Sequence, residues 1–156
     1  MEAELVRSIH IIVMDGLIER PGDFRIRNDA HAGYSITYSP PTMISRGLTR
    51  LVVSVNDAMA RCASPSDAMR IAVVFLERFL LIHPFVNGNG RVALLLMHVL
   101  LHPFLPVPLT IPPPARPEYL DALDDAHNHM NYDRILILVL HSAARHASRV
   151  EWLVHN

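Results

Sequence analysis

Lysine is absent from this chain: all 14 basic residues are arginines, and they stand against 15 acidic residues for a formal net charge of −1. A charge this close to neutral lacks the broad basic field that binding to nucleic acid or to an acidic membrane requires. We therefore expect neither nucleic acid nor a membrane among the partners of this protein. The absence of lysine itself indicates no mechanism.

Cysteine is almost absent too, since Cys62 is the only one. No intramolecular disulfide is possible, and nothing points to an oxidising compartment. We interpret Cys62, just before Ser64-Pro65, as a buried or half-buried structural residue, with a catalytic thiol as the alternative. The N-terminus carries Glu2 and Glu4 instead of a basic segment before an apolar core, which predicts no secretory signal and a cytoplasmic location.

The chain also lacks a long apolar run. Its most apolar stretch, residues 92–101, is interrupted by His98 and followed by His102 and Pro103. A helix needs roughly 20 apolar residues to cross a bilayer, which is about twice the length of this stretch. We therefore predict a buried core helix here and no membrane span.

A chain of 156 residues has the size of one ordinary domain and can bury a core without disulfides or structural metal. We expect a single domain over residues 1–156, with its core at about 5–146. Apolar residues at helical spacing predict helices over residues 5–17, from 42 or 45 to 63, and over 65–82, 91–101, 118–127 and 132–146. Between the first two helices, apolar and polar residues alternate over Tyr34-Ser35-Ile36-Thr37-Tyr38, which predicts a small hairpin or extended flap.

The most informative stretch, residues 83–91, directly precedes an apolar helix and is called the signature segment below. It reads His83-Pro84-Phe85-Val86-Asn87-Gly88-Asn89-Gly90-Arg91. Gly88 and Gly90 let the backbone turn with its N–H groups exposed, and a helix start adds partial positive charge, so the turn can hold a phosphate. His83, expected at the end of the preceding helix, can accept a proton near neutral pH. The segment predicts phosphoryl-group transfer.

The signature segment resembles the pattern of the Fic family, His-x-Phe-x-(Asp or Glu)-Gly-Asn-Gly-Arg-x-x-Arg. The resemblance continues outside it: residues 21–25 look like the segment that leads into a Fic domain, 38–41 like its flap, and 118–123 like the helix after the core. It spans roughly residues 5–146. It implies a mainly α fold, a Fic-type helical bundle with a small β-hairpin flap.

The resemblance implies AMPylation, the transfer of AMP from ATP to a Ser, Thr or Tyr hydroxyl of a protein substrate, with His83 as general base. It implies phosphate and nucleotide binding by Asn87, Gly88, Asn89, Gly90 and Arg91. For the Asn89 side chain we favour phosphate contact over bracing of the turn, and for Arg91 phosphate contact over a surface salt bridge. Phe85 is an anchor that buries its ring. The flap residues Tyr34, Ser35, Ile36, Thr37 and Tyr38 would dock the target by strand addition.

Two departures from the pattern leave the reaction open. Asn87 stands where the family has a carboxylate for Mg²⁺, so we expect a weak Mg²⁺ site with one neutral oxygen. Leu94 stands where the family has a second arginine for the terminal phosphate of ATP, a contact on the order of 1.5–3 kcal/mol. Another nucleoside triphosphate or CDP-choline as donor, and a catalytically impaired nucleotide- or protein-binding module, therefore remain alternatives. A Fic-type kinase is disfavoured, because relatives with that activity carry Ala and Lys in place of Gly88 and Gly90.

Other motifs give weaker signals. His98 and His102 lie one helical turn apart, but they lack a third ligand at suitable spacing, as do His127 and His129, so we predict no metal site from them. The inhibitory helix of many Fic proteins has Ser or Thr four residues before a glutamate. Residues 148–151 have the wrong spacing for it, and we expect no such inhibition.

Overall fold

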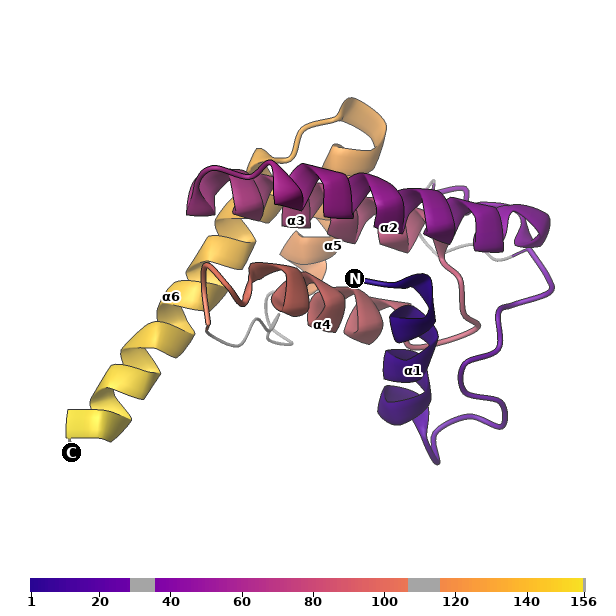
Figure 1. Cartoon of the computed structure of the whole chain (residues 1–156), viewed down its shortest axis with the longest axis horizontal. Coiled ribbons are helices and arrows are strands. Elements are labelled where there is room, and N and C mark those ends of the chain that lie inside the picture. Colours follow the sequence, from indigo (N-terminus) through magenta and orange to yellow (C-terminus); the bar gives the residue numbers. More distant parts are fainter. Residues whose placement is uncertain (29–35, 107–115, 156) are drawn as a thin grey trace.

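The computed structural model describes residues 1–28, 36–106 and 116–155, with the side chains of 116 and 147–155 excepted. This part of the chain is mainly helical (Figure 1). Its elements are α1 (Ala3–Met14), the short 3₁₀ helix η1 (Pro41–Met43), α2 (Ile44–Ala60), α3 (Pro65–Ile82), α4 (Asn89–Leu101), α5 (Arg116–His129) and α6 (Asp133–His155).

Helix α3 is the centre of the bundle. It packs between α2 and α4, α5 and α6 also contact it, and α1 lies against α4 and α2 (Figure 1). Phe75, Leu76 and Phe79 are 1%, 0% and 0% exposed and form its core face. Full burial of each such side chain contributes roughly 1.5–3 kcal/mol, so this helix organises the rest of the domain.

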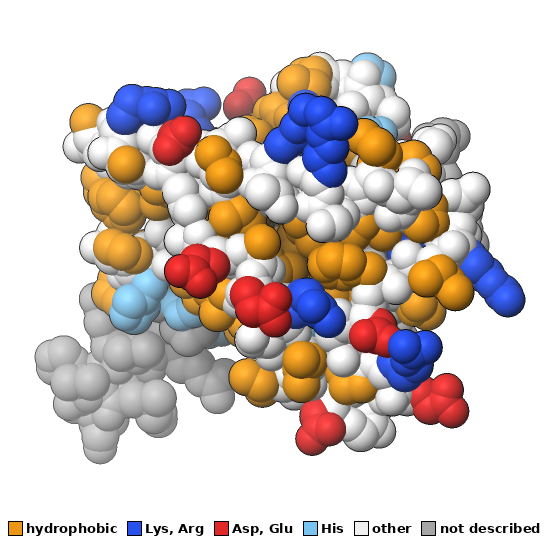
Figure 2. Space-filling view, turned by 45° about the vertical axis from the view of Figure 1, so that its right-hand side comes forward, with side chains coloured by type: hydrophobic (Ala, Val, Ile, Leu, Met, Phe, Trp, Pro, Cys, Tyr) orange, Lys and Arg blue, Asp and Glu red, His pale blue; other side chains and the backbone are white. Residues whose placement is uncertain are grey.

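Helix α4 is the second core element, as its apolar sequence predicts. Val92, Leu96 and Leu101 are all 0% exposed. None of the helices in the described residues has the length and apolar character needed to cross a membrane. On the face of the molecule in Figure 2, basic and acidic side chains are interspersed around apolar ones and do not gather into a field of one sign.

The start of α3 follows from its sequence. The Ser64 hydroxyl accepts a hydrogen bond from the Asp67 N–H over 3.1 Å, and Pro65 takes the first helical position. Serine is a favoured cap, and proline lacks the N–H that would be unpaired at that place. Both predicted bounds of this helix are confirmed.

The end of α3 is set by His83, which adopts a left-handed backbone conformation with φ 47° and ψ 61°. Its N–H still donates to Phe79 O over 3.0 Å. This conformation costs a residue with a Cβ roughly 1–2 kcal/mol, so surrounding contacts must hold it. The chain leaves the helix axis here, and the signature segment begins.

The buried Arg25, 4% exposed, holds that turn. Its guanidinium donates to His83 O over 2.6 Å and to Ile82 O over 3.2 Å, carbonyls at the end of α3 that lack helical partners. It also donates to Arg27 O over 2.8 Å and to Ser39 O. One side chain thus caps the helix and ties two other backbone segments to it.

Most other helix bounds differ from the prediction by one to three residues, and the end of α6 differs by nine, 155 against 146. Helix α1 ends at Met14 instead of residue 17, because Gly16 turns the chain with φ 69°. Helix α4 begins at Asn89 instead of Arg91, because Gly88, with φ 79°, immediately precedes it. Helix α2 begins at Ile44 after η1 and ends at Ala60, and the backbone of α6 continues to His155.

Only part of the predicted hairpin flap lies within the described residues. Tyr34 and Ser35 lie outside the described residues. Thr37 forms an isolated β-bridge, and no strand occurs in the described ranges. The hairpin therefore stays a prediction, while Ser39 N–H donates to Leu81 O over 3.1 Å and keeps this segment beside α3.

Replacing Arg25 with alanine should lower the free energy of unfolding by about 3 kcal/mol, because it leaves several buried carbonyls without a donor. Urea denaturation of the variant measures this loss. Arg27→Ala is the matched control, since its side chain is exposed. Equal stability of Arg25→Ala and Arg27→Ala would contradict the capping role.

Candidate active site

A cavity of about 490 Å³ brings together the flap, the signature segment, α3, α4 and α5. It is lined by Ile36, Tyr38, Glu77, Leu80, Leu81, His83, Val86, Asn87, Gly88, Asn89, Gly90, Arg91, Leu94, Tyr119, Leu120, Leu123 and His127. The predicted catalytic and phosphate-binding residues thus share one cavity. Ile36 and Tyr38 of the predicted flap line it as well.

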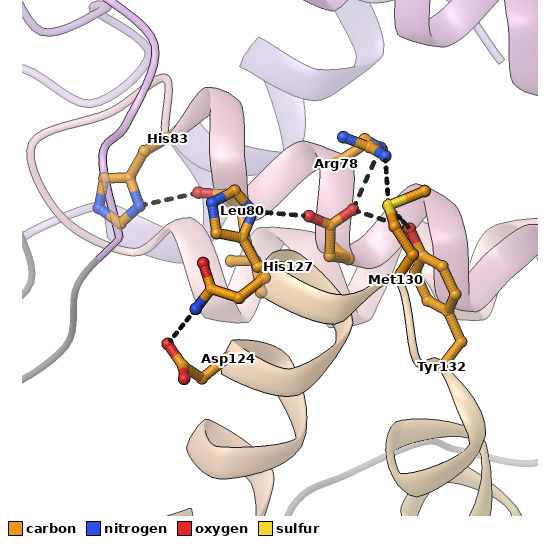
Figure 3. A network of polar contacts seen from close by, with 9 residues as sticks. Arg78, Leu80, His83, Asp124, His127, Met130 and Tyr132 are labelled. Carbon is orange, nitrogen blue, oxygen red and sulfur yellow. Dashed lines mark hydrogen bonds and ion pairs between the residues drawn. The ribbon is translucent and has the colours of Figure 1, made fainter.

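His83 lines the cavity, and neighbours fix its ring. Its ring stacks on Tyr38, with centroids 3.9 Å apart and an interplanar angle of 18°. Its Nδ1 lies 3.3 Å from Leu80 O (Figure 3). A carbonyl only accepts, so Nδ1 carries the proton and Nε2 of the neutral ring is the atom able to take one.

The start of α4 provides backbone donors that have no acceptor inside the helix. Helix α4 begins at Asn89, and the first bond into the helix is from Val92 N–H to Gly88 O, 3.0 Å. The N–H groups of Asn89, Gly90 and Arg91 are therefore first-turn donors without an acceptor inside the helix. Together with the helix dipole they are suited to an anion.

Gly88 is required for this geometry. Its φ is 79°, and a Cβ at this position would lie 2.5 Å from Met14 Sδ. Gly90 differs, because a Cβ there would meet nothing within 4 Å. Of the two glycines, the first serves the turn, and the second leaves the helix start open.

The side chain of Asn89 corrects one expectation. It is 2% exposed, its Oδ1 accepts from Phe85 N–H over 3.0 Å, and its Nδ2 donates to Phe85 O over 2.7 Å. A side-chain amide matches both backbone groups of one residue, so it braces the turn and does not reach for a phosphate. Asn89 can still offer an anion its backbone N–H at the first turn of α4.

A buried histidine in α1 holds the same turn and was missed in the sequence. His10 is 0% exposed, and its ring stacks on Phe85 with centroids 3.7 Å apart and 8° between planes. Its Nδ1 accepts from Gly22 N–H over 2.7 Å, and its Nε2–H donates to Asn87 O over 3.0 Å. Burial lowers the pKa of His10, and the smaller effect of the bond to Asn87 raises it. Phe85, 0% exposed, is the buried anchor that was predicted.

The remaining positions offer little metal-binding character and one exposed cation. The exposed Asn87 already accepts Gly88 N–H at its Oδ1 over 2.7 Å, so it gives Mg²⁺ one neutral, partly occupied oxygen. A site for Mg²⁺ usually includes a carboxylate, and these residues fit that ion poorly. Arg91 is exposed, and its Nη1 lies 3.2 Å from Met14 Sδ. Among the described residues it pairs with no carboxylate, so the surface salt bridge considered as an alternative is not formed with any of them. Leu94 is half-buried against the core.

A second polar group is centred on Glu77 of α3 and His127 of α5, which both line the cavity (Figure 3). Glu77, 2% exposed, meets His127 Nδ1 with its Oε1 at 3.2 Å and Arg78 Nε with its Oε2 at 3.2 Å. The Tyr132 hydroxyl is 3.5 Å from Oε2. Burial, and then the charge of Glu77, raises the pKa of Tyr132. An acidic residue inside the apolar run of α3 is the one sequence signal that could have revealed this group.

The other residues weighed for chemistry have ordinary surroundings. Cys62 is half-buried, and its thiol donates to Ser64 O over 3.1 Å. His98 and His102 meet edge to face with centroids 5.6 Å apart. No group of three or more His, Cys, Asp or Glu side chains suited to a metal occurs in the part of the chain that the structure describes.

The Fic/DOC family model matches residues 1–101 of this chain, which include α1 to α4 and the signature segment. The chain therefore belongs to the Fic/DOC family. It is 28% identical over 137 residues to a Fido domain-containing protein of Dictyostelium discoideum, an alignment that covers 83% of this chain and 91% of that relative.

Solved structures share the fold at low identity. A Fic family protein from Desulfovibrio desulfuricans G20 has a TM-score of 0.76 at 18% identity, covering 97% of this chain and 47% of that one. Fic-1 from C. elegans (TM-score 0.75, 22% identity) covers 99% and 44%. BepC from Bartonella tribocorum with bound AMPPNP (TM-score 0.74, 17% identity) covers 90% and 73%. The chain spans about half the length of the first two structures.

Acid should weaken the contact between α1 and the signature segment. His10 accepts at Nδ1 only when neutral, and burial lowers its pKa below the usual 6.5, so the unfolded chain takes up the proton first. Its contribution to stability is complete above about pH 6.5 and is lost as the pH falls from there through the lowered value.

The variant His10→Phe keeps an aromatic ring on Phe85 but leaves Gly22 N–H and Asn87 O unpaired. Its free energy of unfolding should be about 2–4 kcal/mol lower than the parent's near pH 7.5. On acidification its free energy of unfolding should fall less than that of the parent. Urea denaturation at several pH values measures both effects. His141→Ala, on an exposed position of α6, is the control. If the free energy of unfolding of His10→Phe fell with pH as steeply as that of the parent, this explanation would be contradicted.

Proposed function

We propose that this protein is a Fic-type nucleotidyltransferase, which transfers AMP from ATP to a hydroxyl side chain of a target protein. The observation that carries the proposal is the shared cavity of His83 and the start of α4. It combines a proton acceptor with backbone donors for an anion, as phosphoryl transfer requires. The family resemblance supports the same reaction, and AMPPNP is bound in the BepC structure of similar fold.

In the proposed reaction, His83 Nε2 takes the proton of a Ser, Thr or Tyr hydroxyl as its oxygen attacks the α-phosphorus of the donor. A new oxygen–phosphorus bond forms, the bond from the α-phosphorus to the bridging oxygen breaks, and pyrophosphate leaves with that electron pair. The first-turn N–H groups of α4 stabilise the negative charge that develops on the α-phosphate oxygens. Arg91 steadies the leaving phosphates, and its exposed side chain is able to reach them.

The target would approach along the flap. Tyr38 is stacked on His83, and Ile36 also lines the cavity, so a peptide beside these residues would bring its hydroxyl to the base. Strand addition to residues 34–38 gives affinity through the backbone and asks little of the target's side chains. A protein substrate is therefore part of the proposal.

Incubation of the pure protein with ATP, CTP, GTP, UTP or CDP-choline, with and without Mg²⁺, tests the reaction by intact-mass analysis of self-modification. We expect a mass gain of one nucleotide with ATP. In His83→Ala the rate should fall at least about 100-fold, the usual contribution of a general base. Thermal unfolding of both proteins controls for misfolding. No gain with any donor and no nucleotide binding by calorimetry would instead indicate a non-catalytic module.

A donor without a terminal phosphate is the second candidate, because Leu94 offers no charge to such a group. Leu94→Arg should raise the affinity for ATP about tenfold and leave that for CDP-choline unchanged, since only ATP supplies a terminal phosphate for a charge-assisted contact. Leu94→Met is the apolar control. Equal gains for both donors, measured by calorimetry, would speak against this account of the Leu94 position.

A further inference from the structure

Helix α1 presents two buried side chains to the signature segment, one helical turn apart. His10 is 0% exposed and Met14 is 1% exposed. His10 contacts the middle of the segment, at Phe85 and Asn87. Met14 contacts its end, because its Sδ lies 3.2 Å from Arg91 Nη1 and would lie 2.5 Å from a Cβ at position 88. Positions four apart lie on one face of a helix, so α1 supports both parts of the segment.

The contact between Met14 and Arg91 orients a charge without pairing it. The Arg91 Nη1–H donates to the thioether sulfur, which is a weak and uncharged acceptor. A carboxylate in this place would compete with a phosphate for the guanidinium, because carboxylate and phosphate form the same charge-assisted bonds with arginine. A sulfur atom instead leaves the positive charge available to an anion.

Burial makes Met14 a fixed support for a side chain that is otherwise free to move. Helix α1 packs on α4, and a methionine enclosed in such a contact is held in place although it has three rotatable bonds (Figure 1). Arg91 is exposed and lines the cavity. A long side chain loses rotamer freedom when it binds a ligand, so a contact that already restricts the guanidinium lowers this cost and strengthens binding.

We propose that Met14 is a positioning residue for the donor's phosphates: its buried sulfur holds the guanidinium of Arg91 at the first turn of α4 and leaves the charge to the leaving phosphates. Met14 does not itself line the cavity, so it acts through Arg91. This inference rests on the proposed function, because it takes Arg91 as a ligand of those phosphates. It assigns to α1 a part in donor binding that is separate from the contacts of His10 with the turn.

A double-mutant cycle between positions 14 and 91 tests the proposal, with ATP binding measured by calorimetry in a His83→Ala background. Leucine has about the volume of methionine and is usually tolerated in a core, but it lacks the sulfur. Met14→Leu should weaken ATP binding about 3- to 5-fold when Arg91 is present and leave it unchanged in Arg91→Ala, since residues in contact are coupled. Met97→Leu is the matched control and should bind as the parent does, because Met97 is 0% exposed but does not line the cavity.

AMP distinguishes the positioning of Arg91 from a purely structural role of Met14 beside Gly88. AMP has the α-phosphate that the backbone donors of α4 would meet, but it has no leaving phosphates for Arg91. Met14→Leu should therefore change the affinity for AMP by less than about twofold. A distorted turn at Gly88 would weaken the binding of AMP and ATP alike, and that result would overturn the inference.

Norleucine at the seven methionines replaces each sulfur with a methylene at nearly the same length, and it is the second variant if Met14→Leu does not fold. The norleucine protein should show the same selective loss for ATP, and Arg91→Ala should abolish that difference. Unchanged ATP affinity of folded Met14→Leu, or an equal loss in Arg91→Ala, would overturn the inference alone. No binding of ATP to the parent would overturn the proposed function and this inference with it.

Discussion

The left-handed backbone of His83 is the constraint on which the rest of the site depends. It ends α3 and places His83, the proposed general base, in the cavity with the start of α4. The conformation is unfavourable for a histidine, and contacts from outside the helix hold it: Arg25 on the carbonyls and Tyr38 on the ring. Further along, Asn89 and His10 hold the turn around Phe85. The signature segment is rigid because of neighbours that come from three other parts of the chain.

Local signals predicted the elements well. Ser64-Pro65 marked the start of α3, and Gly88 marked the turn, because capping and positive φ are properties of single residues. Contacts between distant residues had no such signal. Nothing in the sequence links His10 to Phe85, or His127 to Glu77, so both pairs emerged only from the packing. The side chain of Asn89 was misassigned for the same reason: an amide can serve a ligand or the backbone equally, and only the geometry decides.

The two departures from the family pattern are balanced in charge. Asn87 replaces an anionic ligand, and Leu94 replaces a cation, so the formal charge around the donor's phosphates changes by zero overall. What changes is how far the proposed phosphate binding depends on charged side chains. In the proposed reaction, backbone donors at the start of α4 and Arg91 meet the phosphates, and the buried Glu77 is compensated by Arg78. Such a cavity relies more on oriented dipoles than on ion pairs.

The bond between His10 and Asn87 joins residues 77 positions apart. Closing so long a loop costs conformational entropy, which the docking of α1 on the rest of the domain must offset. The signature segment can therefore reach its final shape only once the first helix has docked on the rest of the domain. A chain in which α1 had not docked would contain the whole signature segment and still lack the contacts from His10 that hold its turn.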